Sequence, residues 1–156
     1  MKRFLFVIPL MAAWPVHAAS LIGEVVPPYP EGFSSEMGTC VPEGGDICAF
    51  TIETLHDASG EVVAILGELP VGDGTVRRSR VMDQMPAPAT GPGQAWSLDC
   101  GIGGREDPSV IGLVNYDTST GFAMALDTVW AVRFDIEAKV LEVLDAYAVK
   151  CILPGS

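Results

Sequence analysis

The sequence has few basic residues and almost no histidine. It contains 9 Lys and Arg against 20 Asp and Glu, which gives a net charge of −11, and its two histidines are His17 and His56. An acidic surface without a basic stripe repels nucleic acid, so we expect no nucleic-acid partner. A tetrahedral zinc site would need all the cysteines in one place, because so few histidines are present. We therefore expect no metal site and no cofactor.

The sequence also lacks the short motifs of common catalytic sites. It has no G-x-S-x-G elbow, and the GIGG segment at 101–104 has neither a P-loop lysine nor the Rossmann spacing. His56 is followed by Asp57 and Ser59, but adjacent strand positions point to opposite faces, so these residues do not predict a triad. We expect His56 to end a strand and to cap the following turn together with Asp57. No catalytic residue is assigned, and an enzyme is disfavoured.

No apolar run is long enough to span a membrane as a helix, which takes about 20 residues. The apolar run 4–14 follows Lys2 and Arg3 and precedes the small residues of VHAAS, which is typical of a secretory signal peptide. We predict a signal peptide over 1–18, with an uncleaved membrane anchor as the alternative. Cleavage removes two positive charges and takes the net charge from −11 to −13. The remaining chain is expected to be soluble, without a transmembrane segment, and periplasmic or secreted.

Export to an oxidising compartment decides whether the four cysteines are read as free thiols or as disulfides. In an oxidising compartment an even number of cysteines predicts disulfides, and four cysteines allow three pairings. We predict Cys40–Cys48, because Pro42 and two glycines bend the chain between them, and Cys100–Cys151, which ties the last strand to a central one. Catalytic dithiols usually have two residues between the cysteines, whereas seven separate the first pair. Loop-closure entropy assigns about 2.5 kcal/mol to the short loop and about 4 kcal/mol to the long one.

Proline and glycine mark the N-terminal part of the mature chain. The segment VVPPYPEGF predicts a Pro/Gly-rich extended arm over 19–39, ahead of a single β domain over 40–156. PPYP is also the composition of a polyproline ligand, although a stiff linker is the simpler interpretation.

Alternating apolar residues predict an all-β fold. CAFTIETLH and EVVAILGEL predict a hairpin across 57–60, and TVRRSRVMDQM predicts a third strand. AWSLDC predicts a core strand with Trp96, Leu98 and Cys100 on one face, and SVIGLVNY predicts a buried strand.

The segment 122–151 is ambiguous between helix and strand. Residues 122–135 fit helical spacing, but their clean alternation and β-branched content favour a strand, so one short helix is the alternative. VLEVLDAYAVKC is predicted as the last strand. The resulting fold class is a small, disulfide-stapled antiparallel β sandwich or barrel of about seven strands.

Five charged residues are candidate contacts. Arg78 and Arg80 share one face of a strand and suit a carboxylate or phosphate, with an edge strand that discourages aggregation as the alternative. Asp99, Glu106 and Asp107 lie in or beside GIGGREDP, where the alternatives are a solvated loop and adventitious cation binding. We expect contacts in the loops 101–108 and 86–93, because functional contacts concentrate on loops of a rigid scaffold.

These observations favour an exported, non-catalytic module that binds another envelope or extracellular protein. A basic partner suits the acidic charge. The small, exported, disulfide-bonded β layout is similar to that of bacterial lysozyme inhibitors, which implies an inhibitor-type function, although no inhibitor motif is present. The alternatives are a β domain that binds a small molecule and a hydrolase that uses the carboxylates of Asp99, Glu106 and Asp107.

Overall fold

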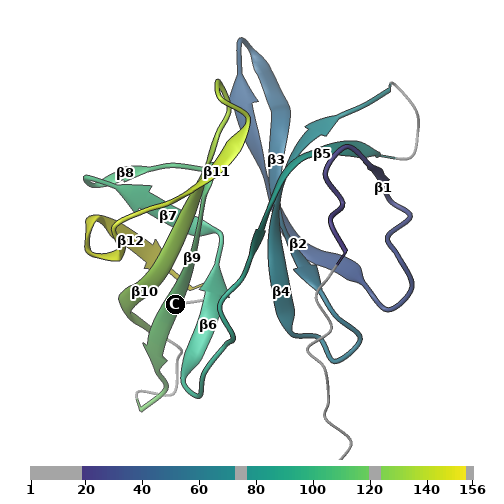
Figure 1. Ribbon diagram of the computed structural model, residues 1–156. Helices are drawn as coiled ribbons and strands as arrows, with labels where there is room; N and C mark the ends of the chain where they lie inside the picture. The colour runs from purple at the N-terminus through teal and green to yellow at the C-terminus, as the bar shows by residue number, and fades with distance from the viewer. Residues whose placement is uncertain (1–18, 73–76, 120–123, 154–156) are drawn as a thin grey trace, which may run out of the picture.

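The computed structural model describes residues 19–72, 77–119 and 124–153, and within them the protein is built almost entirely of antiparallel strands (Figure 1). The predicted signal peptide, 1–18, lies outside the described residues. The predicted all-β, disulfide-bonded fold class is confirmed. Both disulfides have the predicted pairing, Cys40–Cys48 and Cys100–Cys151.

The strands form three antiparallel sheets. Sheet A has the order β1-β5-β4-β3-β2 and consists of β1 (Val25–Val26), β5 (Ser79–Pro86), β4 (Val62–Pro70), β3 (Asp46–His56) and β2 (Ser34–Glu43). Sheet B has the order β11-β10-β9-β6 and consists of β11 (Val140–Val143), β10 (Met124–Asp135), β9 (Val110–Asp117) and β6 (Gln94–Ser97). Sheet C has the order β12-β7-β8 and consists of β12 (Val149–Ile152), β7 (Asp99–Ile102) and β8 (Arg105–Glu106). A 3-10 turn, η1 (Ala146–Ala148), precedes β12.

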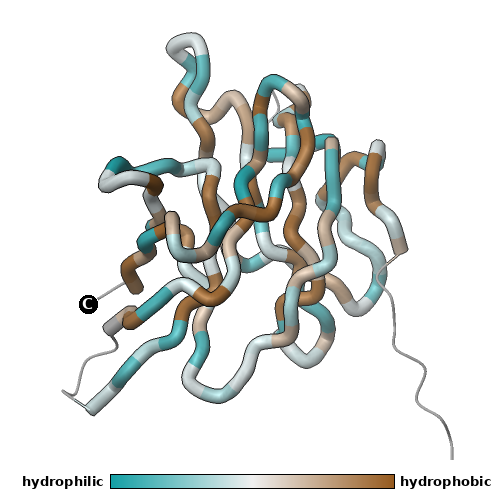
Figure 2. Tube along the Cα trace, turned by 60° about the vertical axis from the view of Figure 1, so that its left-hand side comes forward, coloured by the Kyte–Doolittle hydropathy of each residue, from teal (hydrophilic) through white to brown (hydrophobic). Residues whose placement is uncertain are grey.

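The main core fills the space between sheets A and B. Phe50 of sheet A and Phe134 of sheet B meet edge to face, with ring centroids 5.9 Å apart. The Phe134 ring also packs directly onto Gly67, where a Cβ atom would overlap it. Figure 2 shows hydrophobic stretches along the central strands, whereas most hairpin tips are neutral or hydrophilic. The interior between these sheets is therefore packed with side chains.

A second core joins sheet B to sheet C on the other face of sheet B. It contains Val110 and Val114 of β9 and the disulfide between Cys100 and Cys151. The disulfide lies against Gly112, where a Cβ would stand 2.5 Å from the Cys151 Sγ. Glycine is required here because the disulfide takes the space of a side chain.

The N-terminal arm covers the outer face of sheet A, as Figure 1 shows on the side of β1. Leu21 and Val26 are buried there with Leu55, Leu66 and Val81. β2 begins at Ser34, inside the segment predicted as the arm, so the part of that segment that precedes β2 ends at Phe33.

Several predicted elements are confirmed. β3 and β4 form the hairpin across 57–60, and β9 is the buried strand predicted from SVIGLVNY. β10 is a strand and not the alternative helix, and it pairs with β11 as the predicted hairpin. Its alternation was the correct signal because one face packs on sheet A.

Two predicted strands are each divided in the structure. AWSLDC breaks at Leu98, so Trp96 lies in the core between sheets A and B while Cys100 lies in the core between sheets B and C. The prediction of one shared face was wrong, because the chain passes from sheet B into sheet C at this point. VLEVLDAYAVKC likewise divides into β11, η1 and β12, with the Asp145 side chain accepting the Tyr147 N–H at the turn.

The structure has twelve strands in its described part, more than the seven expected, because some are only two to four residues long. Among the described residues no helix has the length and apolar character needed to cross a membrane.

Candidate functional site

A hollow of about 550 Å³ opens beside sheet C. Its lining brings together the three acidic residues predicted as contacts, Asp99, Glu106 and Asp107. β7 and β12 form one wall and are joined by the disulfide; the β7–β8 turn and the segment that follows β8 form another. We call this the first hollow; its lining also includes Thr39, Leu98, Cys100, Gly101, Gly104, Arg105, Pro108, Lys150 and Ile152.

The shape of the first hollow depends on Gly101. The Arg105 carbonyl packs so closely on Gly101 that an added Cβ would overlap it. Gly103 and Gly104 have φ of 60° and 80°, the left-handed region that glycine adopts without strain. The glycines of GIGGREDP therefore fold the β7–β8 hairpin tightly and carry no phosphate cradle.

Asp107 and Pro108 separate the first hollow from a second one. We call these two residues the Asp107 ridge. The Asp107 backbone N–H donates to the Cys100 carbonyl at 2.9 Å, and its Oδ1 accepts the Ser109 N–H at 3.0 Å and the Ser109 hydroxyl at 2.5 Å. Its Oδ2 has no hydrogen-bond partner among the described residues. The ridge is thus fixed in place while one carboxylate oxygen stays available to a ligand.

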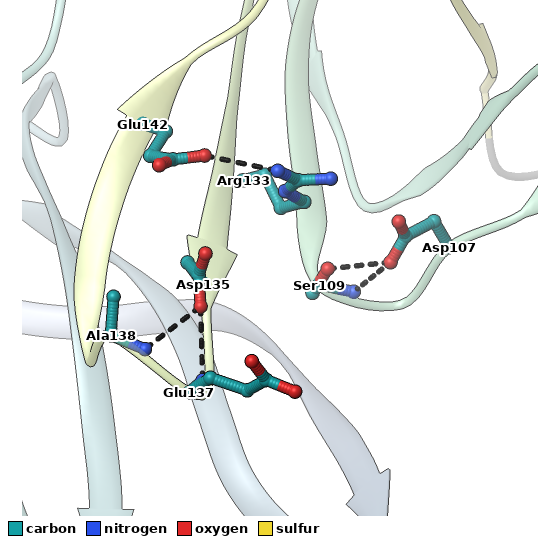
Figure 3. Close-up of polar contacts among 7 residues, drawn as sticks. All are labelled: Asp107, Ser109, Arg133, Asp135, Glu137, Ala138 and Glu142. Carbon is teal, nitrogen blue, oxygen red and sulfur yellow. Dashed lines mark hydrogen bonds and ion pairs between the residues drawn. The ribbon is translucent and has the colours of Figure 1, made fainter.

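The second hollow, about 430 Å³, lies between the Asp107 ridge and the end of β10. It adds the carboxylates of Asp135 and Glu137, and its lining also includes Val41, Pro42, Ser109, Arg133, Phe134 and Ile136. Figure 3 shows Arg133 between Glu142 and the segment of Asp107 and Ser109. The Arg133 guanidinium pairs with Glu142 at 3.0 Å. Asp135 Oδ1 accepts the backbone N–H groups of Glu137 and Ala138, which shapes the β10–β11 turn.

The two hollows together have an excess of negative charge. The basic residues that line them are Arg105, Lys150 and Arg133, and the acidic ones are Asp99, Glu106, Asp107, Asp135 and Glu137. Because Arg133 is paired with Glu142, five carboxylates stand against two cationic side chains that form no ion pair within the described part of the chain. The sequence did not indicate Asp135 and Glu137, because they lie about 30 residues from the ridge along the chain.

Arg78 and Arg80 lie elsewhere and contact the N-terminal arm. The Arg80 guanidinium donates to the Gly23 carbonyl at 2.9 Å, and Arg78 Nε donates to the Pro27 carbonyl at 3.3 Å. β5 lies between β4 and β1, so it is not an edge strand. The structure therefore does not bring these two arginines together with the three acidic contact candidates.

The remaining candidates have structural partners. His56 is buried at the end of β3, with its Nε2 2.8 Å from the Thr54 hydroxyl and its Nδ1 3.1 Å from the Gly60 carbonyl. In the loop 86–93, the Thr90 hydroxyl accepts the Trp96 indole N–H at 3.0 Å. Neither arrangement places a reactive group in the two hollows.

A buried carboxyl on sheet A escaped the sequence prediction. Glu68 of β4 is only 1% exposed, and its Oε1 has no hydrogen-bond partner among the residues that the structure describes. Burial raises the pKa of this carboxyl from its usual 4.5 to about 7. A single acidic residue inside the apolar run VVAILGEL was the available signal, because charged residues are seldom fully buried.

Comparison of the chain with models of protein families, with curated proteins and with solved structures found no match.

Proposed function

We propose that the protein is an exported, non-catalytic module that binds a basic protein through the Asp107 ridge and the two hollows beside it. One observation carries this proposal: Asp99, Glu106 and Asp107 line one hollow, and Asp107 also borders a second hollow that contains Asp135 and Glu137. Lysine and arginine side chains of a partner would meet carboxylates in both hollows.

The first hollow has the chemical pattern of a protein interface. Leu98, Pro108 and Ile152 give it an apolar part, and the Ile152 side chain is 61% exposed. Charged residues complete the lining. Protein interfaces combine an apolar centre with a polar rim in the same way, and the energy of binding concentrates in the centre.

The charge of the whole chain supports the choice of a basic partner. A net charge of −11 attracts a cationic protein over a distance of about one Debye length, roughly 8 Å in physiological salt. Complementary charge speeds association more than it strengthens the final complex. The two disulfides are consistent with an oxidising compartment, which supports a periplasmic or secreted location.

The proposal is tested by capture and then by titration. Tagged, oxidised protein is used as bait in an extract of the envelope and medium of the producing cells, and each captured protein is purified and titrated calorimetrically. The ridge variant carries Asp107→Asn and Glu137→Gln, and Asn keeps an oxygen acceptor for the Ser109 N–H. The control variant carries Glu31→Gln and Glu61→Gln, two exposed residues outside both hollows, and so has the same net charge.

We expect the ridge variant to raise the Kd of the partner about tenfold, equivalent to about 1.4 kcal/mol. The control variant should change it much less, and raised salt should weaken binding to the wild type. Equal affinities of the two variants, or a partner that binds only through uncharged contacts, would contradict the proposal.

A small-molecule ligand is the second candidate, because the first hollow has a volume within the usual range of ligand pockets, about 300–1,000 Å³. A screen of low-molecular-weight cations by ligand-observed NMR tests it. Binding that survives in the ridge variant but disappears with Ile152→Asp would favour a small ligand in the first hollow over a protein partner.

A further inference from the structure

Glu68 is buried in sheet A without a full set of partners. It is 1% exposed, and the Thr51 hydroxyl donates to its Oε2 across a long 3.4 Å, while Oε1 accepts no hydrogen bond from the described part of the chain. The Ser79 side chain also hydrogen-bonds this carboxyl. A buried carboxylate that lacks donors is costly, whereas the neutral carboxylic acid is tolerated much better. The site therefore favours the protonated form of Glu68.

The N-terminal arm, residues 19–33, covers the face of sheet A on which Glu68 lies. Leu21 and Val26 are buried against Leu66 and Val81 on this face, and Val81 is the register partner of Glu68. Several polar contacts hold the arm, and β1 within it pairs with β5. Among these contacts, the Leu21 N–H donates to Gln84 Oε1 at 2.7 Å, the Gly23 N–H donates to the Val81 carbonyl at 2.8 Å, and Arg80 donates to the Gly23 carbonyl at 2.9 Å.

A second carboxylate lies next to Glu68 and is bound to the arm. Glu53 of β3 accepts the Tyr29 hydroxyl at 3.3 Å and the Ser35 hydroxyl at 2.6 Å, both on Oε2. Its side chain passes over Gly38, where a Cβ would stand 2.6 Å from the Glu53 Cγ. Glu53 is thus held where it is, and it contacts Tyr29 of the arm directly.

The charges that face Glu68 come from three elements. Glu53 on β3 adds to the effect of burial and raises the pKa of Glu68 further, whereas Arg77, which precedes β5, lowers it. On the arm, burial together with the charges of Glu68 and Glu53 raises the pKa of the Tyr29 phenol, so Tyr29 stays neutral. Ionised Glu68 therefore faces one carboxylate and a neutral phenol, and the influences that lower its pKa are the hydrogen bonds from Ser79 and Thr51 and, after them, the Arg77 charge.

We propose that residues 19–33 form a strap over sheet A whose closure depends on the protonation of Glu68. With Glu68 protonated, the buried acid is neutral and the arm packs over it. With Glu68 ionised, a second negative charge lies beside Glu53 under the arm, and opening the arm lets water reach it. Closure takes up a proton, so by linkage a rise in pH shifts the equilibrium toward the open strap. The strap is on the face of sheet A that is turned away from sheet B, so it is independent of the two hollows.

The pH range of this effect is set by the pKa of Glu68 with the strap open and with the strap closed. An exposed glutamate titrates near 4.5, and Glu68 under the closed strap titrates at about 7. Between these values the equilibrium constant for opening should rise by up to about tenfold per pH unit, and above pH 7 it should level off. A strap without this coupling would open to the same extent at every pH.

Hydrogen exchange on the intact, oxidised protein tests the proposal. The probes are the Leu21 and Gly23 amides, and their rates at pH 5.5, 6.5, 7.5 and 8.5 are divided by the intrinsic rates at the same pH. Amides of β9 report global unfolding. Wild type is compared with Glu68→Gln, which is permanently neutral, and with Glu36→Gln, which removes an exposed carboxyl from β2.

In the wild type and in Glu36→Gln, the equilibrium constant for opening, measured at the Leu21 and Gly23 amides, should rise by at least tenfold between pH 5.5 and 7.5 and then level off. In Glu68→Gln it should not change with pH. A second variant, Glu53→Gln, keeps an oxygen for Tyr29 and Ser35 but removes the neighbouring charge, so the rise should move to lower pH. Equal pH dependence in wild type and Glu68→Gln, or an unmoved rise in Glu53→Gln, would overturn the proposal.

Discussion

Replacing Glu68 with glutamine should change how the stability of the whole protein depends on pH. Its carboxyl has a pKa of about 7 in the folded protein against a usual value of 4.5, so between these values the folded state binds a proton that the unfolded state has lost. The free energy of unfolding therefore falls as pH rises through this window, by up to about 1.4 kcal/mol per unit. Over the whole window this amounts to about 3 kcal/mol, and above pH 7 the loss is complete.

Glutamine removes this titration and leaves the shape of the side chain nearly unchanged. The new amide N–H₂ group takes the place of an oxygen and needs acceptor partners, and their absence imposes a cost of about 1–3 kcal/mol that does not depend on pH. The sign of the stability difference at a single pH is therefore not the test. The test is how this difference changes with pH. Relative to wild type, the free energy of unfolding of Glu68→Gln should increase by about 3 kcal/mol between pH 4.5 and pH 7.5.

Denaturant unfolding of the oxidised protein measures this difference. Trp96 and Trp130 pack edge to face at 5.7 Å beside the main core, so tryptophan fluorescence should report the loss of that core. Glu36→Gln removes an exposed carboxyl, so its free energy of unfolding should depend on pH in the same way as that of the wild type. If the difference between Glu68→Gln and wild type stayed constant within about 0.5 kcal/mol from pH 5 to pH 8, the argument from burial would be refuted.

Three further predictions concern packing and are measured by denaturant unfolding. Gly67→Ala should lose about 1–3 kcal/mol, because its Cβ overlaps the Phe134 ring, and adding Phe134→Leu should recover part of this loss; simple additivity would contradict the contact. Replacing both Cys100 and Cys151 with alanine should cost about 4 kcal/mol, since the bond spans 51 positions of the chain, and a loss below about 1 kcal/mol would contradict this. Gly112→Ala should lose about 1–3 kcal/mol with the disulfide present and clearly less in the double alanine variant, where the sulfur atoms no longer fill that space.

The sequence was most informative where the pattern is local. The hairpin across 57–60 follows from a turn signal between two strand patterns, and the Cys40–Cys48 disulfide follows from a bend between neighbouring cysteines. The two sheet changes were missed for a physical reason. A period of two residues describes a strand but does not say which sheet the strand joins, so the break at Leu98 and the division of 140–151 have no signal in the alternation.

In the candidate site, too, the residues close together in the sequence could be predicted, whereas those from a distant segment could not. Asp99, Glu106 and Asp107 meet in one hollow because they flank a single short hairpin. Asp135 and Glu137 come to the other side of the ridge only because β10 ends there, and that placement depends on the packing of sheet B against sheet A. Contacts between segments far apart in the chain are set by tertiary structure, which no local pattern encodes.

The disulfide between Cys100 and Cys151 also explains how such short strands can form one wall of the first hollow, which we propose as a binding site. β7 and β12 have four residues each, too few for a stable isolated pair. The bond joins two residues that are register partners in this pair, with their Cα atoms 4.0 Å apart, and its sulfur atoms pack on Gly112 of sheet B. Asp99 and Gly101 flank one cysteine, and Lys150 and Ile152 flank the other; all four line the first hollow. A wall fixed in this way before binding costs a partner less ordering entropy, which favours a preformed interface over one that folds on contact.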